Sequence, residues 1–270
     1  MNLNNAVSAI HNTFRPLTDA WQSFTDRFPL HLAEEQFLPH PVPNTSDGVA
    51  ELFLLPPRTD SADGLSFDVD CLLAQAYARM TSYPHVVRFT VNSDMSPNGR
   101  LPLLAAADGR LLAGKDVIDE IQSKSQHSED TEELPFIALA DLDLRVAFLH
   151  HFLLVPANSN HITSPWYDAH YASPISWILF YLEQRKARRW VEARKLDTEY
   201  IASTRSALAS ISTYITSRTP SSAPSLFDAT LFAYLHHLLS TTAPDTHISK
   251  VVAGAGDVVT SIVSDPPSSG

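Results

Sequence analysis

The chain has 270 residues, of which 44% are hydrophobic and 18% are charged. This apolar fraction is enough for one large folded domain or two smaller ones, and it excludes a disordered chain. The 30 acidic and 19 basic residues give a formal net charge of −11, which disfavours a protein that coats nucleic acid. An anionic partner would therefore have to meet a local basic patch.

Glycine and cysteine are both scarce. The eight glycines form no dinucleotide fingerprint and no phosphate-binding loop, so nucleotide chemistry is not expected. Cys71 is the single cysteine, which excludes an intrachain disulfide and favours a reducing compartment. No apolar run reaches the length of about 18 residues that a membrane-spanning helix needs. We expect neither a secretory signal nor a transit peptide at the N-terminus, because acidic residues offset the basic ones there.

Residues 1–48 are predicted to form an N-terminal extension. Apolar residues recur in it at spacings of three and four, which draws one stripe along a helix that we expect to begin near Arg15. Either the stripe packs on the protein's own body, or it docks on a partner or a membrane surface. Its candidate contact residues are Phe14, Leu17, Trp21 and Phe24.

Residues 49–124 have the pattern of a small mixed domain that begins with a βαβ unit. Asp68 and Asp70 stand where a helix N-terminus favours negative charge. The expected order is strand, helix, strand, strand, strand, helix. The corresponding ranges are 49–55, 68–80, 85–91, 101–104, 110–113 and 116–123.

A polar run over 125–134 is predicted to be a linker, and residues 135–264 to form an all-helical domain. Its apolar residues recur at helical spacing in five segments, joined by short loops rich in proline, serine and threonine. The segments are 136–155, 174–195, 197–217, 226–240 and 247–264. Ser225 and Asp228 form a capping-box signal before the fourth segment. Residues 265–270 are a tail without a structural signal.

This order of elements resembles the glutathione-transferase superfamily, in which a thioredoxin-like domain precedes an all-α domain, and Pro102 stands where those proteins carry a cis-proline. Four segments are informative within that superfamily: DCLLAQAY (70–77), MSPNGRLPL (95–103), YASPISWILFYLEQRKARRWVEA (171–193) and SLFDATLFAYLHHL (225–238). They resemble the metaxins, components of the mitochondrial outer-membrane machinery that inserts β-barrel proteins. The second and third segments are similar to the metaxin-2 branch more than to the metaxin-1 branch. The fungal member of that branch is an accessory subunit of the sorting and assembly machinery.

The resemblance implies an α/β domain followed by an all-α domain, and a role without catalysis. By this resemblance, the chain is a peripheral subunit on the cytosolic face of the mitochondrial outer membrane that assists recognition and insertion of β-barrel precursors. The implied partners are the membrane-embedded barrel insertase, a second metaxin-like subunit and the precursors, with anionic lipids as a further candidate. No cofactor, metal or nucleic acid is expected. The alternative is a glutathione-dependent transferase of a divergent class.

Residues that such a transferase needs are missing from the expected places. The superfamily stabilises a thiolate with Ser, Tyr or Cys at the start of its first helix, where only Ser66 and Cys71 are candidates here. Cys71 has no His or Arg partner visible in the sequence and is expected to be an inert buried side chain. The acid–serine pair that holds the γ-glutamyl group is replaced by Gly114 and Lys115, and the lysine would repel the γ-glutamyl ammonium.

The histidines carry no metal-site pattern. His150–His151 and His236–His237 are adjacent pairs within predicted helices, where neighbouring side chains diverge by about 100° and do not bind one metal from one face. We expect the twelve histidines to be packing or surface residues.

The strongest anomaly is the charge of residues 183–195. This segment holds six basic and two acidic residues, a net charge of +4, which leaves −15 on the other 257 residues. It is either a solvated helix face balanced by Glu183 and Glu192, or a docking surface for acidic protein loops or anionic lipid headgroups. Its candidate contact residues are Arg185, Lys186, Arg188 and Arg189. The side chains expected to continue the packed side of this helix are Tyr181, Leu182 and Trp190.

Overall fold

The computed structural model describes residues 49–58, 63–125, 131–194, 199–218 and 225–254, all of which belong to one compact unit of the chain. The extension over 1–48 lies outside the described residues, and so do the tail over 265–270 and half of the predicted linker, residues 126–130. The contacts predicted for Phe14, Leu17, Trp21 and Phe24 therefore stay predictions.

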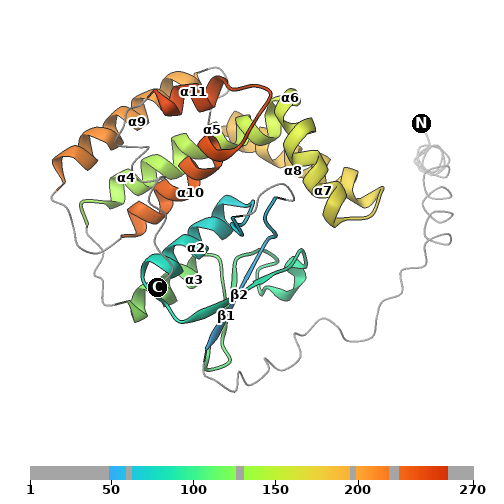
Figure 1. Ribbon diagram of the computed structural model, residues 1–270, viewed down its shortest axis with the longest axis vertical. Helices are drawn as coiled ribbons and strands as arrows, with labels where there is room; N and C mark the ends of the chain where they lie inside the picture. Colours follow the sequence, from blue (N-terminus) through green and yellow to red (C-terminus); the bar gives the residue numbers. More distant parts are fainter. Residues whose placement is uncertain (1–48, 59–62, 126–130, 195–198, 219–224, 255–270) are drawn as a thin grey trace, which may run out of the picture. The chain divides into compact units, whose positions relative to one another are not determined.

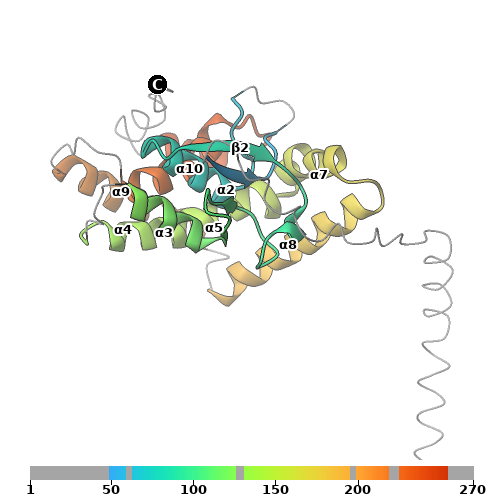
Figure 2. The ribbon, with the colours of Figure 1, turned by 90° about the horizontal axis from the view of Figure 1, so that it is seen from below.

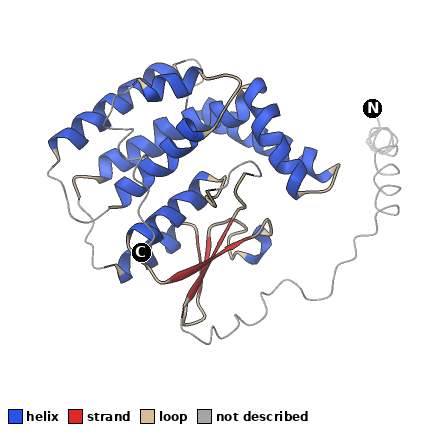
Figure 3. Ribbon diagram, viewed as in Figure 1, coloured by secondary structure: helices blue, strands red, loops and turns tan. Residues whose placement is uncertain are grey.

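A four-stranded mixed sheet forms the first part of the described chain (Figures 1 and 3). Its strands are β1 (Ala50–Leu54), β2 (His85–Phe89), β3 (Leu103–Ala105) and β4 (Leu111–Ala113). Their order across the sheet is β2-β1-β3-β4, with β1 parallel to β2 and antiparallel to β3, and β3 antiparallel to β4. Leu52 at the centre pairs with Val87 on one side and Leu104 on the other. The predicted βαβ unit and the two later strands are confirmed.

Local signals in the sequence place the helices of this part. These helices are α2 (Val69–Met80), the 3₁₀ turn η1 (Ser93–Met95) and α3 (Lys115–Lys124). The side chain of Asp68 caps α2 by accepting a hydrogen bond from the backbone N–H of Cys71 at 2.9 Å. The peptide bond between Leu101 and Pro102 is cis, as the resemblance implies. Helix α2 lies between β1 and helix α10 (Leu226–Ser240) (Figure 1).

The rest of the described chain is helical (Figure 3), with three π-helical segments labelled η. The elements before α10 are α4 (Leu134–Leu139), η2 (Ala140–Leu144), α5 (Arg145–Leu149), η3 (His150–Leu154), α6 (Pro156–Asn158), η4 (Ser159–Thr163), α7 (Ser164–His170), α8 (Ile175–Ala193) and α9 (Tyr200–Ser217). After α10 comes α11 (His247–Ala253). The predicted α-helical domain is confirmed, and the capping box at Ser225 and Asp228 is formed.

The loop expected between 155 and 174 is wrong, because α6, η4 and α7 form there. The prolines of this stretch stand in the first turns of α6 and α7, where a missing N–H costs no helical hydrogen bond. Asn158, a residue that usually favours turns, is buried and bonds in both directions with the backbone of Asp245, at 2.7 and 3.0 Å. This tertiary partner is 87 positions away, so the local pattern does not reveal it.

One hydrophobic core joins the sheet to the helices. Leu52 of β1, Leu72 of α2, Leu208 of α9 and Phe227 of α10 belong to one cluster of fully buried side chains. The residue boundaries predicted for the two domains stay predictions, but the two halves pack against each other.

Candidate functional site

A cleft of about 390 Å³ opens beside the N-terminus of α2, with walls from both the sheet side and the helices. Its walls include the first turn of α2 and parts of α5, η3, α7 and α8. The charged side chains that line it are Asp68, Asp70, Arg100, Arg145, Glu183 and Lys186. The resemblance implies that a transferase would stabilise its thiolate at the start of this helix, so the chemistry of the cleft bears on the transferase alternative.

The N-terminus of α2 is already occupied by carboxylates. Asp68 accepts from the N–H of Cys71, and Asp70 follows two positions later. Burial raises the pKa of Asp68 to about 6, and the nearby charge of Asp70 acts in the same direction. A free helix N-terminus stabilises an anion, but this one holds its own acid and would repel a substrate thiolate.

Neither candidate nucleophile is free to react. Cys71 is fully buried, and burial together with the charge of Asp68 raises the pKa of its thiol well above the ordinary value. The thiolate needed for nucleophilic attack is thus disfavoured. Ser66 is fully buried as well, and its Oγ accepts from the backbone N–H of Asp68 at 3.3 Å.

The start of α3 lacks the acid of a glutathione site. Gly114 is the N-cap residue and has a φ of +62°, a conformation that favours glycine. Its N–H donates to the carbonyl of Pro102 at 3.2 Å, and the Lys115 side chain that follows is exposed. The position therefore offers a cation and no side-chain acceptor.

Helix α8 supplies one wall of the cleft and packs against α7 and η3 at the edge of the helical part (Figure 2). Its inner face is a buried stripe at spacings of four and seven. The stripe consists of Ser176, Phe180, Ala187 and Val191. Between them, Gln184 donates to the carbonyl of Leu153 at 2.9 Å and so ties α8 to η3.

The opposite side of α8 is exposed along most of its length. We call it the outer face of α8; it has an apolar half followed by a basic half. The apolar half is Ile175, Trp177, Ile178, Tyr181 and Leu182, and the basic half is Arg185, Arg188 and Arg189.

The prediction that Tyr181 and Leu182 are packed is wrong. They are 52% and 48% exposed, because they follow the buried Phe180 by one and two positions and so turn away from α7 and η3. Residues 175–182 are all apolar except Ser176, so the hydrophobic period does not select a face. Trp190 is half-buried, lines the cleft and lies 3.6 Å beneath the guanidinium of Arg194.

The four basic candidate residues lie in two different environments. Arg185, Arg188 and Arg189 are exposed on the outer face, as the predicted common face requires. Lys186 instead donates to Glu183 at 3.0 Å, and both residues line the cleft.

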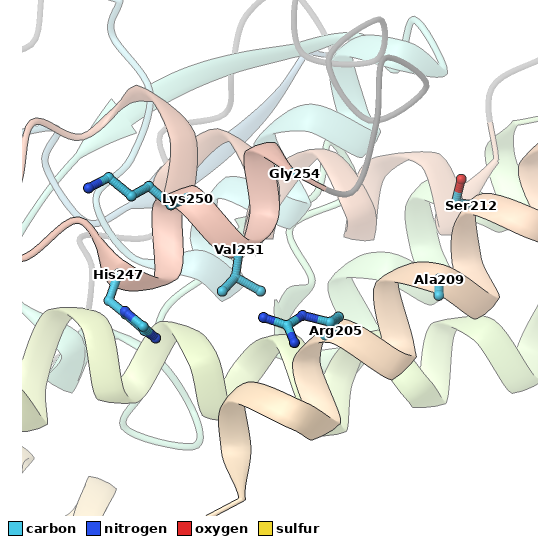
Figure 4. A pocket seen from close by; sticks show the side chains of 7 residues that line it. All are labelled: Arg205, Ala209, Ser212, His247, Lys250, Val251 and Gly254. Atoms are coloured by element: carbon cyan, nitrogen blue, oxygen red, sulfur yellow. The ribbon is translucent and has the colours of Figure 1, made fainter.

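A second hollow, of about 710 Å³, lies between α9 and α11 (Figure 4). Arg205 and Ser212 line it from α9, and His247 and Lys250 from α11. Ser212 and His247 stand at opposite ends of the view, so the hollow does not bring this hydroxyl and this base together. None of these residues belongs to a predicted site.

The adjacent residues His150 and His151 have different partners. The ring of His150 stacks on Tyr200 at 3.9 Å, whereas His151 contacts the amide of Asn158 at 3.2 Å. Within the described ranges, no three His, Cys, Asp or Glu side chains gather as a metal site. None of the described helices is long and apolar enough to span a bilayer.

Known proteins similar to this chain fall into two groups. The Tom37 family, described as "Outer mitochondrial membrane transport complex protein", matches residues 71–184. The "Metaxin-1 homolog" of Caenorhabditis briggsae is 29% identical over 210 residues, covering 72% of this chain and 66% of that protein. "Metaxin-1" of Mus musculus is 26% identical over 212 residues, 70% of this chain and 66% of that protein. The "Metaxin-2 homolog" of Caenorhabditis elegans is 27% identical over 144 residues, 48% of this chain and 60% of that protein.

The second group shares the fold alone. A glutathione S-transferase of Ceriporiopsis subvermispora superposes with a TM-score of 0.53 at 12% identity, covering 80% of this chain and 95% of that chain. The transferase GSTFuA3 of Phanerochaete chrysosporium gives a TM-score of 0.52 at 10% identity, covering 80% and 94%.

The matched part of this chain spans just under two thirds of the first two metaxin relatives. Metaxin-1 and metaxin-2 proteins both match, so the metaxin-2 branch stays a prediction. The chain is similar to the metaxins and to the Tom37 family, and it has the fold of the glutathione transferases.

Proposed function

We propose that this chain is a non-enzymatic, peripheral subunit of the machinery that inserts β-barrel proteins into the mitochondrial outer membrane, on the cytosolic face. Its partners are then the membrane-embedded barrel insertase, a second metaxin-like subunit and the β-barrel precursors. The description of the matched family, an outer mitochondrial membrane transport complex protein, supports the transport role.

One observation carries the non-enzymatic part of the proposal. Asp68 and Asp70 occupy the helix N-terminus at which a transferase stabilises a thiolate, and Cys71 behind them is fully buried. The carboxylate of Asp68 already accepts from the helix N-terminus, so a second anion would compete with it there. The chain then keeps the transferase fold without a site for the thiolate, and it serves as a scaffold.

The edge of the sheet offers a candidate contact for a precursor strand. Among the described strands, β2 has a single neighbour, β1. Val86 and Phe89 of β2 are 42% and 43% exposed. An extended segment pairs with such an edge through main-chain hydrogen bonds, while exposed side chains supply selectivity.

Affinity purification of the tagged chain from mitochondria tests the proposal. The barrel insertase and a second metaxin should co-purify, and depletion of the chain should slow insertion of a β-barrel precursor but not import of a matrix protein. Replacing Val86 and Phe89 by Asp should reduce crosslinking to the precursor, whereas Leu142→Asp, at a similarly exposed site in η2, should not.

The transferase alternative predicts a different outcome. The purified chain would be retained on glutathione resin and would show thiol-dependent turnover that Cys71→Ala or Ser66→Ala abolishes. Either result, or normal β-barrel insertion after depletion, would contradict the proposal.

A further inference from the structure

We infer that the outer face of α8 docks on an anionic lipid surface, with its apolar half at the boundary of the acyl chains and its basic half among the headgroups. The inference rests on the proposed location at the outer membrane and adds the surface and the class of ligand.

The apolar half is the main concentration of exposed hydrophobic side chains in the described part of the chain. Nine large hydrophobic side chains are exposed in the whole described part of the chain. Five of these nine stand in the first eight residues of α8. Trp177, at 67%, is the most exposed of the nine, and its ring stacks on Tyr181 with centroids 6.2 Å apart. Contiguous apolar patches of this kind mark interaction sites, and Trp and Tyr are the residues enriched at membrane interfaces.

The basic half continues the apolar half along the same side of the helix. Arg185 follows Tyr181 by four positions, and Arg188 follows it by seven, so the three side chains share a face. Arg189 stands seven positions after Leu182 in the same way. At a rise of about 1.5 Å per residue, the outer face runs for about 21 Å.

Within the described part of the chain the outer face keeps a net positive charge, because the exposed Glu192 on the same side of α8 offsets one of the three arginines at most. No acidic side chain in that part forms an ion pair with Arg185, Arg188 or Arg189, whereas the neighbouring Lys186 is paired with Glu183. The chain as a whole carries −11, so the outer face is an exception that complements a negative surface. Anionic headgroups attract such juxtaposed basic residues.

Binding to a lipid surface explains both the apolar and the basic half of the outer face. Binding to an acidic protein loop explains the basic half alone. A loop that paired with the three arginines would leave Trp177, Ile178 and the other apolar side chains in water. A helix lying in the membrane interface buries its apolar side chains below the headgroups and keeps its arginines at headgroup level.

Flotation of the full-length chain with vesicles tests the inference. One set contains phosphatidylcholine alone, and the other equal parts of phosphatidylcholine and phosphatidylinositol. Because residues 1–48 carry their own predicted apolar stripe, the α8 variants decide the outcome rather than flotation alone. We expect binding to the anionic vesicles, and at least about a 100-fold weaker partition for the variant Arg185→Glu/Arg188→Glu/Arg189→Glu.

Matched variants control for net charge and for exposed apolar area. Arg79→Glu/Arg100→Glu/Arg205→Glu makes the same charge change at exposed arginines outside α8 and should bind like the wild type. Trp177→Ser/Tyr181→Ser/Leu182→Ser should lose binding, whereas Val86→Ser/Phe89→Ser should keep it. Brominated lipid should quench the emission of the wild type more than that of Trp177→Phe. Circular dichroism of each variant verifies its fold.

Three results would overturn the inference: no binding of the wild type to anionic vesicles, equal binding of the α8 and control variants, or equal quenching of wild type and Trp177→Phe. If the α8 variants bound vesicles normally but lost the insertase in co-purification, the outer face would be a protein contact. That result would leave the proposed function standing, since co-purification of the wild type tests it separately.

Discussion

The guanidinium of Arg145 at the start of α5 lies 2.6 Å from the carboxylate of Asp70 in the first turn of α2, across 75 positions of sequence. The same guanidinium lies 3.7 Å from Asp141 and over the ring of Tyr234, whose hydroxyl donates to Asp141 at 2.9 Å. This network links α2, η2, α5 and α10, and two of its members, Asp70 and Arg145, line the cleft. It gives Asp70 a structural role.

Replacing Arg145 by Met should destabilise the fold by about 1–3 kcal/mol, because Asp70 and Asp141 would keep their charges without the cation that satisfies them. Asp70→Asn should cost less, since the Asp70 side chain is 49% exposed and water screens the pair. Urea unfolding measures both. As a control, Arg110→Met removes the ion-pair partner of Asp108 and Glu120; the Arg110 side chain is 51% exposed, so its loss should cost less than Arg145→Met. Equal losses would contradict the special role of Arg145.

Ser225→Ala should cost about 1 kcal/mol of unfolding free energy, because α10 would lose the side-chain acceptor for its N3 backbone N–H. Asp228→Ala should cost more. Its carboxylate accepts from the Ser225 backbone at 2.9 Å and from Arg218 at 2.8 Å. Thermal unfolding of the two variants gives the order, and a smaller loss for Asp228→Ala would refute the capping-box account.

His237 should make the fold less stable in mild acid. It is buried beside Phe67, Phe148 and Phe152, and burial lowers its pKa to about 3. The unfolded chain binds a proton at about pH 6.5 and the folded chain does not, so stability falls as the pH drops through that value. At pH 5 this effect of His237 amounts to about 2 kcal/mol.

The variant His237→Phe should therefore lose less stability than the wild type between pH 7.5 and pH 5. The raised pKa of Asp68 acts in the opposite direction, because the folded chain then binds a proton near pH 6 that the unfolded chain releases. It is common to both proteins and cancels in their difference. His161→Phe, at an exposed site in η4, is the matched control. Parallel pH profiles for wild type and His237→Phe would disprove the prediction.

Cys71 should resist thiol reagents in the folded protein. Its burial and raised pKa leave neither access nor thiolate, so iodoacetamide should label one thiol per chain only in denaturant. Mass spectrometry with and without urea measures this. Rapid labelling of the folded chain would instead point to a reactive cysteine and would favour the transferase alternative.

The fold was predictable where the signal is local or periodic. Asp68 and the Ser225–Asp228 box mark helix starts through contacts three positions long, and the strands of the βαβ unit show as apolar runs bounded by turns. The helix over 156–170 was not predictable, because Asn158 is satisfied by Asp245, a residue far along the chain. The composition of such a stretch indicates a loop until that partner is known.

For the candidate site, the sequence determined that α8 carries a basic cluster and that Arg185, Arg188 and Arg189 share a face, because helical geometry alone sets that relation. Only the tertiary structure decided which side of residues 175–182 is covered. Nearly every residue there is apolar, so periodicity selects no side, and burial follows from where α7 and η3 lie. They cover Ser176 and Phe180 and leave Trp177, Tyr181 and Leu182 beside the arginines.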